Sequence, residues 1–347
     1  MSRADWHSLD EDDVRIRAPR HGSRPRTKIR PQHANAVLAR VVRVDRGRYR
    51  VMLEHDSSHA LSAMRSRELT GVQIVVGDLV DLVGDLSGQP GSLARIVRVQ
   101  PRVSVLRRSA DDVDPAERVI VAGAQQLVIV TALANPPPRP GLIDRCLVAA
   151  YDAGLTPVLC LTKADLGSPD QLIQLYTGLD LAVVTVGRST TSATPPNRRL
   201  IGLEHVAKLL VGRVSVLVGH SGVGKSTLVN ALVAGAGQAV GKVNQVTGRG
   251  RHTSSAAVAL PLAAGGWVID TPGVRSFGLS HVTDQQLLAA FADIAEPAMT
   301  CPRGCTHLSN APDCELDQWV NDDAQRHQRL ASFRRLWECR QTPAFPR

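Results

Sequence analysis

The strongest constraint on the fold is an octapeptide, Gly219 to Ser226, which lies between an apolar run and a helical pattern. It reads Gly-His-Ser-Gly-Val-Gly-Lys-Ser and follows residues 214–218, so it matches G-x-x-x-x-G-K-[ST] in the context that this pattern requires. In such a loop backbone N–H groups surround phosphates, Lys225 reaches the terminal phosphates and Ser226 ligates Mg²⁺. The sequence therefore predicts a nucleoside triphosphate site formed by Gly219, His220, Ser221, Gly222, Val223, Gly224, Lys225, Ser226 and Thr227.

Two further motifs follow apolar runs on either side of this loop. Asp270-Thr271-Pro272-Gly273 comes after it, where Asp270 can hold magnesium through water and Gly273 lets the backbone approach the γ-phosphate. Thr162-Lys163-Ala164-Asp165 comes before it. The Asp165 carboxylate can accept hydrogen bonds from the guanine N1–H and 2-amino groups, which adenine lacks, while the Lys163 stem packs on the purine. The sequence thus predicts GTP rather than ATP, with Thr162, Lys163 and Asp165 at the base.

Apolar runs of strand length alternate with helical patterns between residues 108 and 281. The expected strands are residues 127–131, 157–161, 183–186, 214–218 and 267–269, and the expected helices are 142–152, 169–177, 202–210 and 225–233. This order predicts an α/β domain with a doubly wound, mostly parallel sheet.

Residues 34–107 have a different texture, with short β-branched runs at 37–44, 49–53, 72–76, 79–83 and 94–99. Five short strands without a helical period predict a Greek-key β-barrel of the OB type. Such barrels bind oligonucleotides or serve as structural modules, and RNA contact is favoured here by Arg40, Arg43, Arg46, Arg48 and Arg50. Residues 1–33 are expected to form a disordered basic arm, either a solubilising tail or a phosphate-binding segment.

The charge of the whole chain bears on its partners. The 347 residues carry a formal net charge of +9, which favours polyanionic partners. Phe, Trp and Tyr make up 3% of the chain, too few for a base-stacking platform, so nucleic-acid binding should depend on charge and shape. No run approaches the roughly 20 apolar residues of a membrane span, and the first thirty residues lack a signal-peptide pattern. We expect a cytoplasmic monomer without membrane association.

The last segment, residues 282–347, contains a helical pattern at 285–292 and a group of potential metal ligands. Cys301, Cys305, His307 and Cys314 offer three thiolates and one imidazole, a set that suits a structural, tetrahedral Zn²⁺. Free thiols or a disulfide are the alternatives. Cys339 lies outside this spacing. The basic stretch 321–340 predicts an amphipathic helix packed on the zinc unit, with its charged face in solvent.

The order of the three nucleotide motifs is circularly permuted, and from about residue 35 the chain resembles the RsgA (YjeQ) family of GTPases. The resemblance also rests on residues 126–130, 142–145, 250–253 and 274–278 and on the Cys/His cluster. It implies a GTP hydrolase that binds the small ribosomal subunit and its rRNA and assists late maturation, with ribosome-stimulated turnover. We expect one structural Zn²⁺ per chain, and Mg²⁺ bound with GTP.

The resemblance also assigns residues for hydrolysis. Val274 stands where Ras-like enzymes have a water-positioning Gln, so His252 is the expected catalytic residue, and Thr253 is the expected second hydroxyl on magnesium. Thr162 replaces the Asn of many GTPases, and no Ser-Ala base contact is recognisable between residues 183 and 194. Two rival functions remain at this point: a P-loop ATPase or nucleotide kinase, and an RNA-binding assembly factor that uses GTP only as a binding switch.

Overall fold

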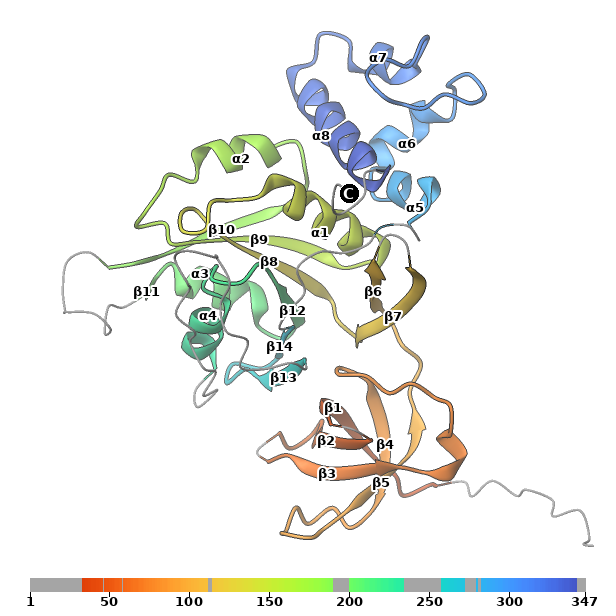
Figure 1. Cartoon of the computed structure of the whole chain (residues 1–347), viewed down its shortest axis with the longest axis vertical. Helices are drawn as coiled ribbons and strands as arrows, with labels where there is room; N and C mark the ends of the chain where they lie inside the picture. The colour runs from red at the N-terminus through yellow and green to blue at the C-terminus, as the bar shows by residue number, and fades with distance from the viewer. Residues whose placement is uncertain are drawn as a thin grey trace, which may run out of the picture. The chain divides into compact units, whose positions relative to one another are not determined.

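The computed structural model describes residues 33–45, 47–57, 59–111, 114–189, 200–233, 257–271, 279 and 282–341. Its first folded part is a five-stranded barrel that closes in the order β1-β2-β3-β5-β4-β1 (Figure 1). The β3–β5 pair is parallel and the other pairs are antiparallel. The strands are β1 (Val37–Asp45), β2 (Arg48–Leu53), β3 (Leu61–Arg65), β4 (Leu79–Gly84) and β5 (Ala94–Val99). The prediction of an OB-type barrel is therefore confirmed.

One of the five predicted strands is wrong. Residues 72–76 form no strand; only Val76 makes an isolated bridge, to Val121, while the N–H of Val75 donates to the side chain of Asp78 at 2.8 Å. The third strand is instead β3, where the buried Leu61 and Ala63 alternate with the half-buried Ser62 and the exposed Met64. Ile74, Val75 and Val76 are buried as part of a connection rather than of a strand, and hydrophobicity alone does not distinguish the two cases.

The central sheet follows a hairpin of β6 (Val105–Asp111) and β7 (Asp114–Ala122), which spans the predicted boundary at residue 108. The strand order of the sheet is β11-β10-β9-β8-β12-β14-β13, parallel from β10 to β14, with β11 and β13 antiparallel to their neighbours. β13 also pairs with β1 of the barrel, where Val258 lies opposite Arg43. The strands are β8 (Gln126–Ala132), β9 (Thr156–Thr162), β10 (Ala182–Arg188), β11 (Leu200–Ile201), β12 (Val214–Val218), β13 (Val258–Pro261) and β14 (Trp267–Asp270). The predicted doubly wound sheet is present.

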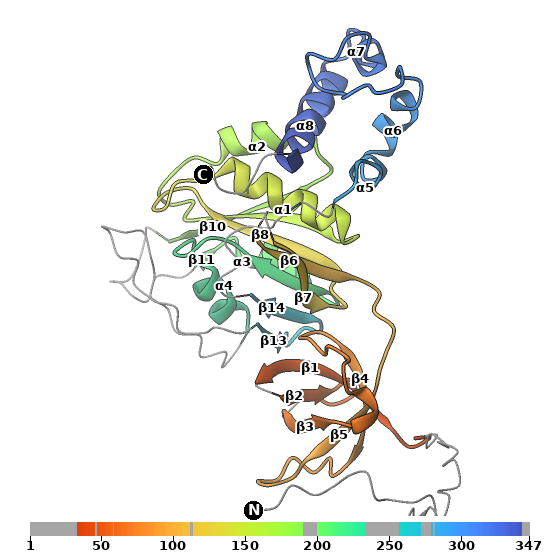
Figure 2. The same cartoon turned by 45° about the vertical axis from the view of Figure 1, so that its right-hand side comes forward.

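Helices cover both faces of this sheet (Figures 1 and 2). Successive residues of β8 face opposite sides, so Leu127 and Ile129 pack with α1 and α2, while Val128 and Val130 pack with α3 and α4. The helices are α1 (Pro140–Asp152), α2 (Asp170–Tyr176), α3 (Leu203–Leu210) and α4 (Lys225–Leu232). Strands buried on both faces explain why their sequences are continuously apolar.

The C-terminal segment consists of four helices around a loop that carries the Cys/His cluster. They are α5 (Asp284–Ala289), α6 (Ala292–Ala298), α7 (Glu315–Val320) and α8 (Ala324–Gln341). Phe291 and Phe333 are fully buried and stack edge to face, 5.3 Å apart, which joins α8 to the α5–α6 connection. No helix among the described residues is long and apolar enough to cross a membrane.

Of the α8 arginines expected on a solvated face, Arg326 is exposed, but Arg329, Arg334 and Arg335 are half-buried, which corrects the prediction for these three. Arg329 binds Asp293 through two hydrogen bonds of 3.0 Å and donates to the carbonyl of Gly178 at 3.1 Å. Arg326 lies over the ring of Trp319. Long cationic side chains can bury their stems while their heads reach acceptors on neighbouring elements, so Arg329 holds α8 against α6 and the segment after α2.

Arg335 makes the most buried of these contacts. Its Nε lies 3.2 Å from both carboxylate oxygens of Asp144, an α1 residue that is 3% exposed. The guanidinium also donates to the carbonyl of Leu175 and lies over the ring of Tyr176. Burial raises the pKa of Asp144, and the charge of Arg335 opposes that rise. The pair therefore ties α8 to α1.

We expect Arg335→Gln to destabilise the protein by about 2–3 kcal/mol at neutral pH, because it leaves the carboxylate of Asp144 buried without its cation. Without the guanidinium the pKa of Asp144 rises further above its usual value. The carboxyl group then becomes neutral as the pH falls through that raised pKa, so the penalty is full above it and shrinks below it.

Denaturant unfolding at about pH 7 and about pH 5 measures this dependence on protonation. Arg326→Gln, on the more exposed side of the same helix, is the control and should cost little at either pH. A penalty for Arg335→Gln that is equal at the two pH values would contradict the assignment.

Candidate functional site

The predicted phosphate loop connects β12, in the middle of the sheet, to the N-terminus of α4. Gly222 and Gly224 have φ values of +83° and +94°, which favour glycine. A Cβ atom on Gly219 would lie 2.3 Å from the carbonyl oxygen of Val130, so only glycine allows the loop to pass this close to β8. The loop therefore needs its glycines for conformation and for close packing, and α4 presents its free N–H groups at the loop.

Lys225 and Asp270 meet where β12 and β14 end. The Nζ of Lys225 lies 2.7 Å from Oδ1 of Asp270 in an ion pair, and it donates to the carbonyl of Thr271 at 2.8 Å. Both side chains are nearly buried, with 11% and 5% exposed. The hydroxyl of Thr271 donates to the carbonyl of Leu217 at 2.8 Å, which joins the two strand ends. The predicted phosphate lysine and switch aspartate are thus direct neighbours.

The predicted base-reading turn is bonded to the same loop. The hydroxyl of Thr162, at the end of β9, contacts the carbonyl of Val223 in the phosphate loop and lies 3.2 Å from that of Thr131. Lys163 has a φ of +56° and donates from its Nζ to the carbonyl of Asn135. The threonine that replaces asparagine therefore links the turn to the phosphate loop.

Asp165 is held by a strand that sequence reasoning left without a role. The backbone N–H of Arg188, the last residue of β10, donates to Oδ1 of Asp165 at 2.9 Å. Gly187 precedes it, and a Cβ atom there would lie 3.0 Å from the backbone nitrogen of Asp165. Gly187-Arg188 therefore occupies the position where a second base contact was sought. The sequence signal that could have identified Gly187-Arg188 is its position at the end of the strand that follows the base-reading turn.

The charges around this turn affect Lys163. Burial lowers its pKa, the nearby charge of Arg188 lowers it further, and Asp165 partly opposes both. The turn therefore combines one carboxylate, Asp165, with two cationic side chains, Lys163 and Arg188.

Three residues of the predicted nucleotide site, His252, Thr253 and Gly273, lie outside the described residues. Ser226 and Thr227 lie in the first turn of α4, as the phosphate loop requires.

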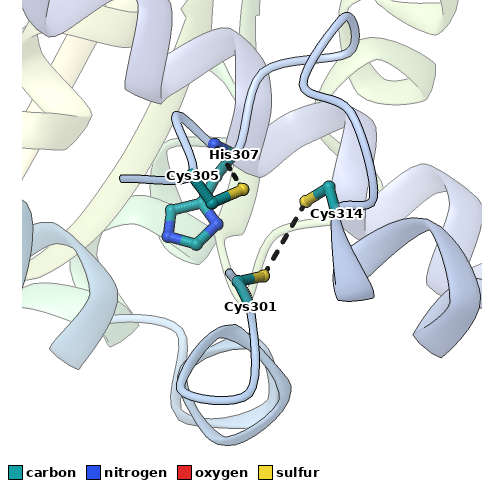
Figure 3. Close-up of side chains that lie close together, drawn as sticks. All are labelled: Cys301, Cys305, His307 and Cys314. Carbon is teal, nitrogen blue, oxygen red and sulfur yellow. Dashed lines mark hydrogen bonds between the residues drawn. The ribbon is translucent and has the colours of Figure 1, made fainter. Parts of the chain in front are cut away.

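The four predicted metal ligands come together in the C-terminal segment (Figure 3). One ligand atom from each of Cys301, Cys305, His307 and Cys314 lies within 4.8 Å of the others, and the sulfurs of Cys301 and Cys314 are 4.0 Å apart. These separations fit four ligands around one tetrahedral ion. This cluster could hold a metal.

The imidazole of His307 fits the same role. Its Nδ1 is buried with no hydrogen-bond partner, and burial lowers its pKa, which favours the neutral ring that metals bind. The ring packs edge to face on Trp337 of α8, 5.6 Å away. An orphaned ring nitrogen beside three thiols is accounted for if the cluster binds a metal.

Arg334 of α8 supports the cluster from outside, and sequence reasoning did not assign it a role. It donates to the carbonyl of His307 at 3.0 Å and to the sulfur of Cys314 at 3.8 Å. It also binds Asp317 of α7 through two hydrogen bonds of 2.8 and 2.9 Å. A cation at this place offsets the negative charge of thiolates and connects α8 to the cluster.

The strand order and the order of the motifs define the class of this protein. The turn after β9 precedes the phosphate loop after β12, and the aspartate after them ends β14, with β8 and β12 adjacent at the centre of the sheet. This is a circularly permuted P-loop GTPase. More narrowly, the chain belongs to the RsgA GTPase family, whose model matches residues 99–280.

Relatives and solved structures agree with this family. Small ribosomal subunit biogenesis GTPase RsgA of Ectopseudomonas mendocina (strain ymp) is 38% identical over 248 residues, covering 70% of this chain and 68% of the relative. The protein of the same name from Azotobacter vinelandii is 36% identical over 274 residues, covering 78% and 76%.

The fold is shared with YjeQ from Thermotoga maritima, with a TM-score of 0.60, 23% identity and coverage of 87% of this chain and 98% of that one. It is also shared with YloQ, a circularly permuted GTPase, with a TM-score of 0.58, 23% identity and coverage of 91% and 99%.

Proposed function

We propose that this GTPase binds the small ribosomal subunit and its rRNA, assists late maturation of the subunit and hydrolyses GTP when bound to it. The observation that carries the proposal is that Thr162 of the base-reading turn contacts the phosphate loop, while Asp165 of the same turn accepts a hydrogen bond from the end of β10. Relatives of 36–38% identity bear the name small ribosomal subunit biogenesis GTPase. The nucleotide pair is GTP and GDP, and the protein acts as a cytoplasmic monomer.

The nucleotide site is proposed to use the residues named from the sequence. Phosphate oxygens would compete with Asp270 for the ammonium of Lys225, and release of this nearly buried carboxylate frees it to hold water on Mg²⁺. Ser226 and Thr253 supply hydroxyls to that ion, and Gly273 approaches the γ-phosphate. His252 positions the attacking water, so stimulated turnover that survived His252→Ala unchanged would exclude that role.

The remaining parts have proposed roles as well. The barrel, residues 34–107, contacts rRNA through its arginines, and residues 1–33 form a basic arm. Residues 108–281 form the GTPase domain, and residues 282–347 form a domain held by one Zn²⁺ per chain.

Hydrolysis assays with purified ribosomal subunits test the function. GTP and ATP are each offered to the protein alone, with small subunits and with large subunits. We expect strong stimulation of GTP hydrolysis by small subunits only. Equal stimulation with ATP would favour a P-loop ATPase or kinase, and GTP binding without repeated turnover would favour a binding switch.

Asp165→Asn tests the base-reading role. We expect GTP affinity to fall at least about a hundredfold, because the amide presents a donor to the donors of guanine. Xanthosine triphosphate carries a carbonyl in place of the 2-amino group, so its affinity should rise. Competition against a fluorescent GDP measures both values. Asp170→Asn, an exposed carboxylate at the start of α2, is the control, and GTP binding by Asp165→Asn as tight as that of wild type would contradict the role.

A further inference from the structure

The carboxylate of the base-reading turn can bind only some of the hydrogen-bonding groups of guanine. Guanine has two donors, N1–H and the 2-amino group, and two acceptors, O6 and N7. The carboxylate of Asp165 is acceptor-only when ionised, so it can serve the donors but not O6 or N7. A complete site needs a donor at this second edge, because unpaired polar groups reduce affinity when the base is enclosed.

Two of the nearby donors already have partners. The hydroxyl of Thr162 has a single hydrogen and faces the carbonyls of Val223 and Thr131. The ammonium of Lys163 donates to the carbonyl of Asn135. The hydroxyl of Thr162 therefore has no further hydrogen to offer, and the ammonium of Lys163 is directed toward Asn135 by one of its three hydrogens.

Arg188 offers a further side-chain donor beside the turn, within the part of the chain that the structure describes. Its backbone N–H holds Asp165 at 2.9 Å, so its side chain starts at the edge of the base site. Val186 pairs in register with Thr162, which places the end of β10 level with the end of β9. The side chain is exposed, and no ion pair joins its guanidinium to a carboxylate within the described part of the chain. Its charge is also felt at Lys163, whose pKa it lowers.

We propose that Arg188 is a specificity-determining residue whose guanidinium donates to O6 and N7 of guanine while its backbone N–H orients Asp165. This rests on the proposed role of Asp165 in reading the base. An arginine fork matches O6 and N7 of guanine with two parallel hydrogen bonds. Adenine carries an amino group in place of O6, which would face the guanidinium donor to donor. Arg188 and Asp165 together therefore read both edges of the base.

Competition against a fluorescent GDP by GTP, 7-deaza-GTP and ATP tests the proposal, since 7-deaza-GTP lacks only the N7 acceptor. Wild type should bind GTP about tenfold more tightly than 7-deaza-GTP. Arg188→Ala should weaken GTP binding by at least that factor, because the contacts to O6 and N7 are both lost, and it should bind GTP and 7-deaza-GTP equally. Arg188→Lys, which keeps the charge without the fork, should fall between. Arg213→Ala is the control, because this exposed arginine precedes β12 at the opposite end of the strand from the phosphate loop.

The outcomes separate the two proposals. If Arg188→Ala keeps the wild-type preference for GTP over 7-deaza-GTP while GTP is still preferred to ATP, the role of Arg188 is overturned and that of Asp165 stands. If wild type binds GTP and ATP equally, base reading by Asp165 is overturned, and the role of Arg188 with it.

Discussion

Lys225→Ala is expected to lower GTP turnover at least about a hundredfold, the usual effect of removing a preorganised group that stabilises charge on a transferring phosphoryl group. Lys225 belongs to the phosphate loop, its ammonium is paired with Asp270, and its side chain is 11% exposed. α4, as the structure describes it, contains no second lysine that could take over this role. Nucleotide binding should weaken in parallel, since the ammonium attracts phosphate in the ground state as well.

The same substitution should also lower stability, because it leaves Asp270 nearly buried without its counter-charge. Turnover, GDP affinity and thermal unfolding should therefore be measured together. Lys208→Ala, an exposed lysine in α3, serves as the control and should change none of the three. Unchanged turnover in folded Lys225→Ala would exclude the phosphate loop as the catalytic site.

Cys314→Ser is expected to remove the metal from the C-terminal segment and to unfold the loop around it. Cys314 is 3% exposed, lies 4.0 Å from the sulfur of Cys301 and directly precedes α7. The loop between α6 and α7 contains no strand or helix, so bound metal would supply much of its folding free energy. We expect metal content to fall from about one ion per chain to nearly none.

Metal analysis and limited proteolysis of residues 282–341 measure these effects. Cys339→Ser is the control, since that thiol lies 3.9 Å from the carbonyl of Gly141, away from the cluster. Chelator treatment of wild type should reproduce the proteolysis pattern of Cys314→Ser. A full equivalent of metal in Cys314→Ser would contradict the four-ligand site.

Local pattern was sufficient for most of the nucleotide domain but less so for the barrel. The strands and helices of the nucleotide domain have hydrophobic periods that are visible in a single sequence. The four ligands of the Cys/His cluster are also close enough in sequence for their spacing to identify them as a group. In the barrel, residues 72–76 have the composition of a strand, and β3 has weaker hydrophobicity. Only the pairing of β3 with β2 and β5 distinguishes them, and pairing is a long-range property.

The sequence by itself determined the phosphate loop, the permuted order of motifs, the alternating sheet and the ligand set of the cluster, because each depends on residues that are near neighbours in the chain. The tertiary structure alone decided which partners the arginines have. Arg335 meets Asp144 from a helix far along the chain, Arg334 meets the cluster, and Arg188 meets Asp165 across parallel strands. Such pairs form only when packing brings distant elements together, so no local pattern records them.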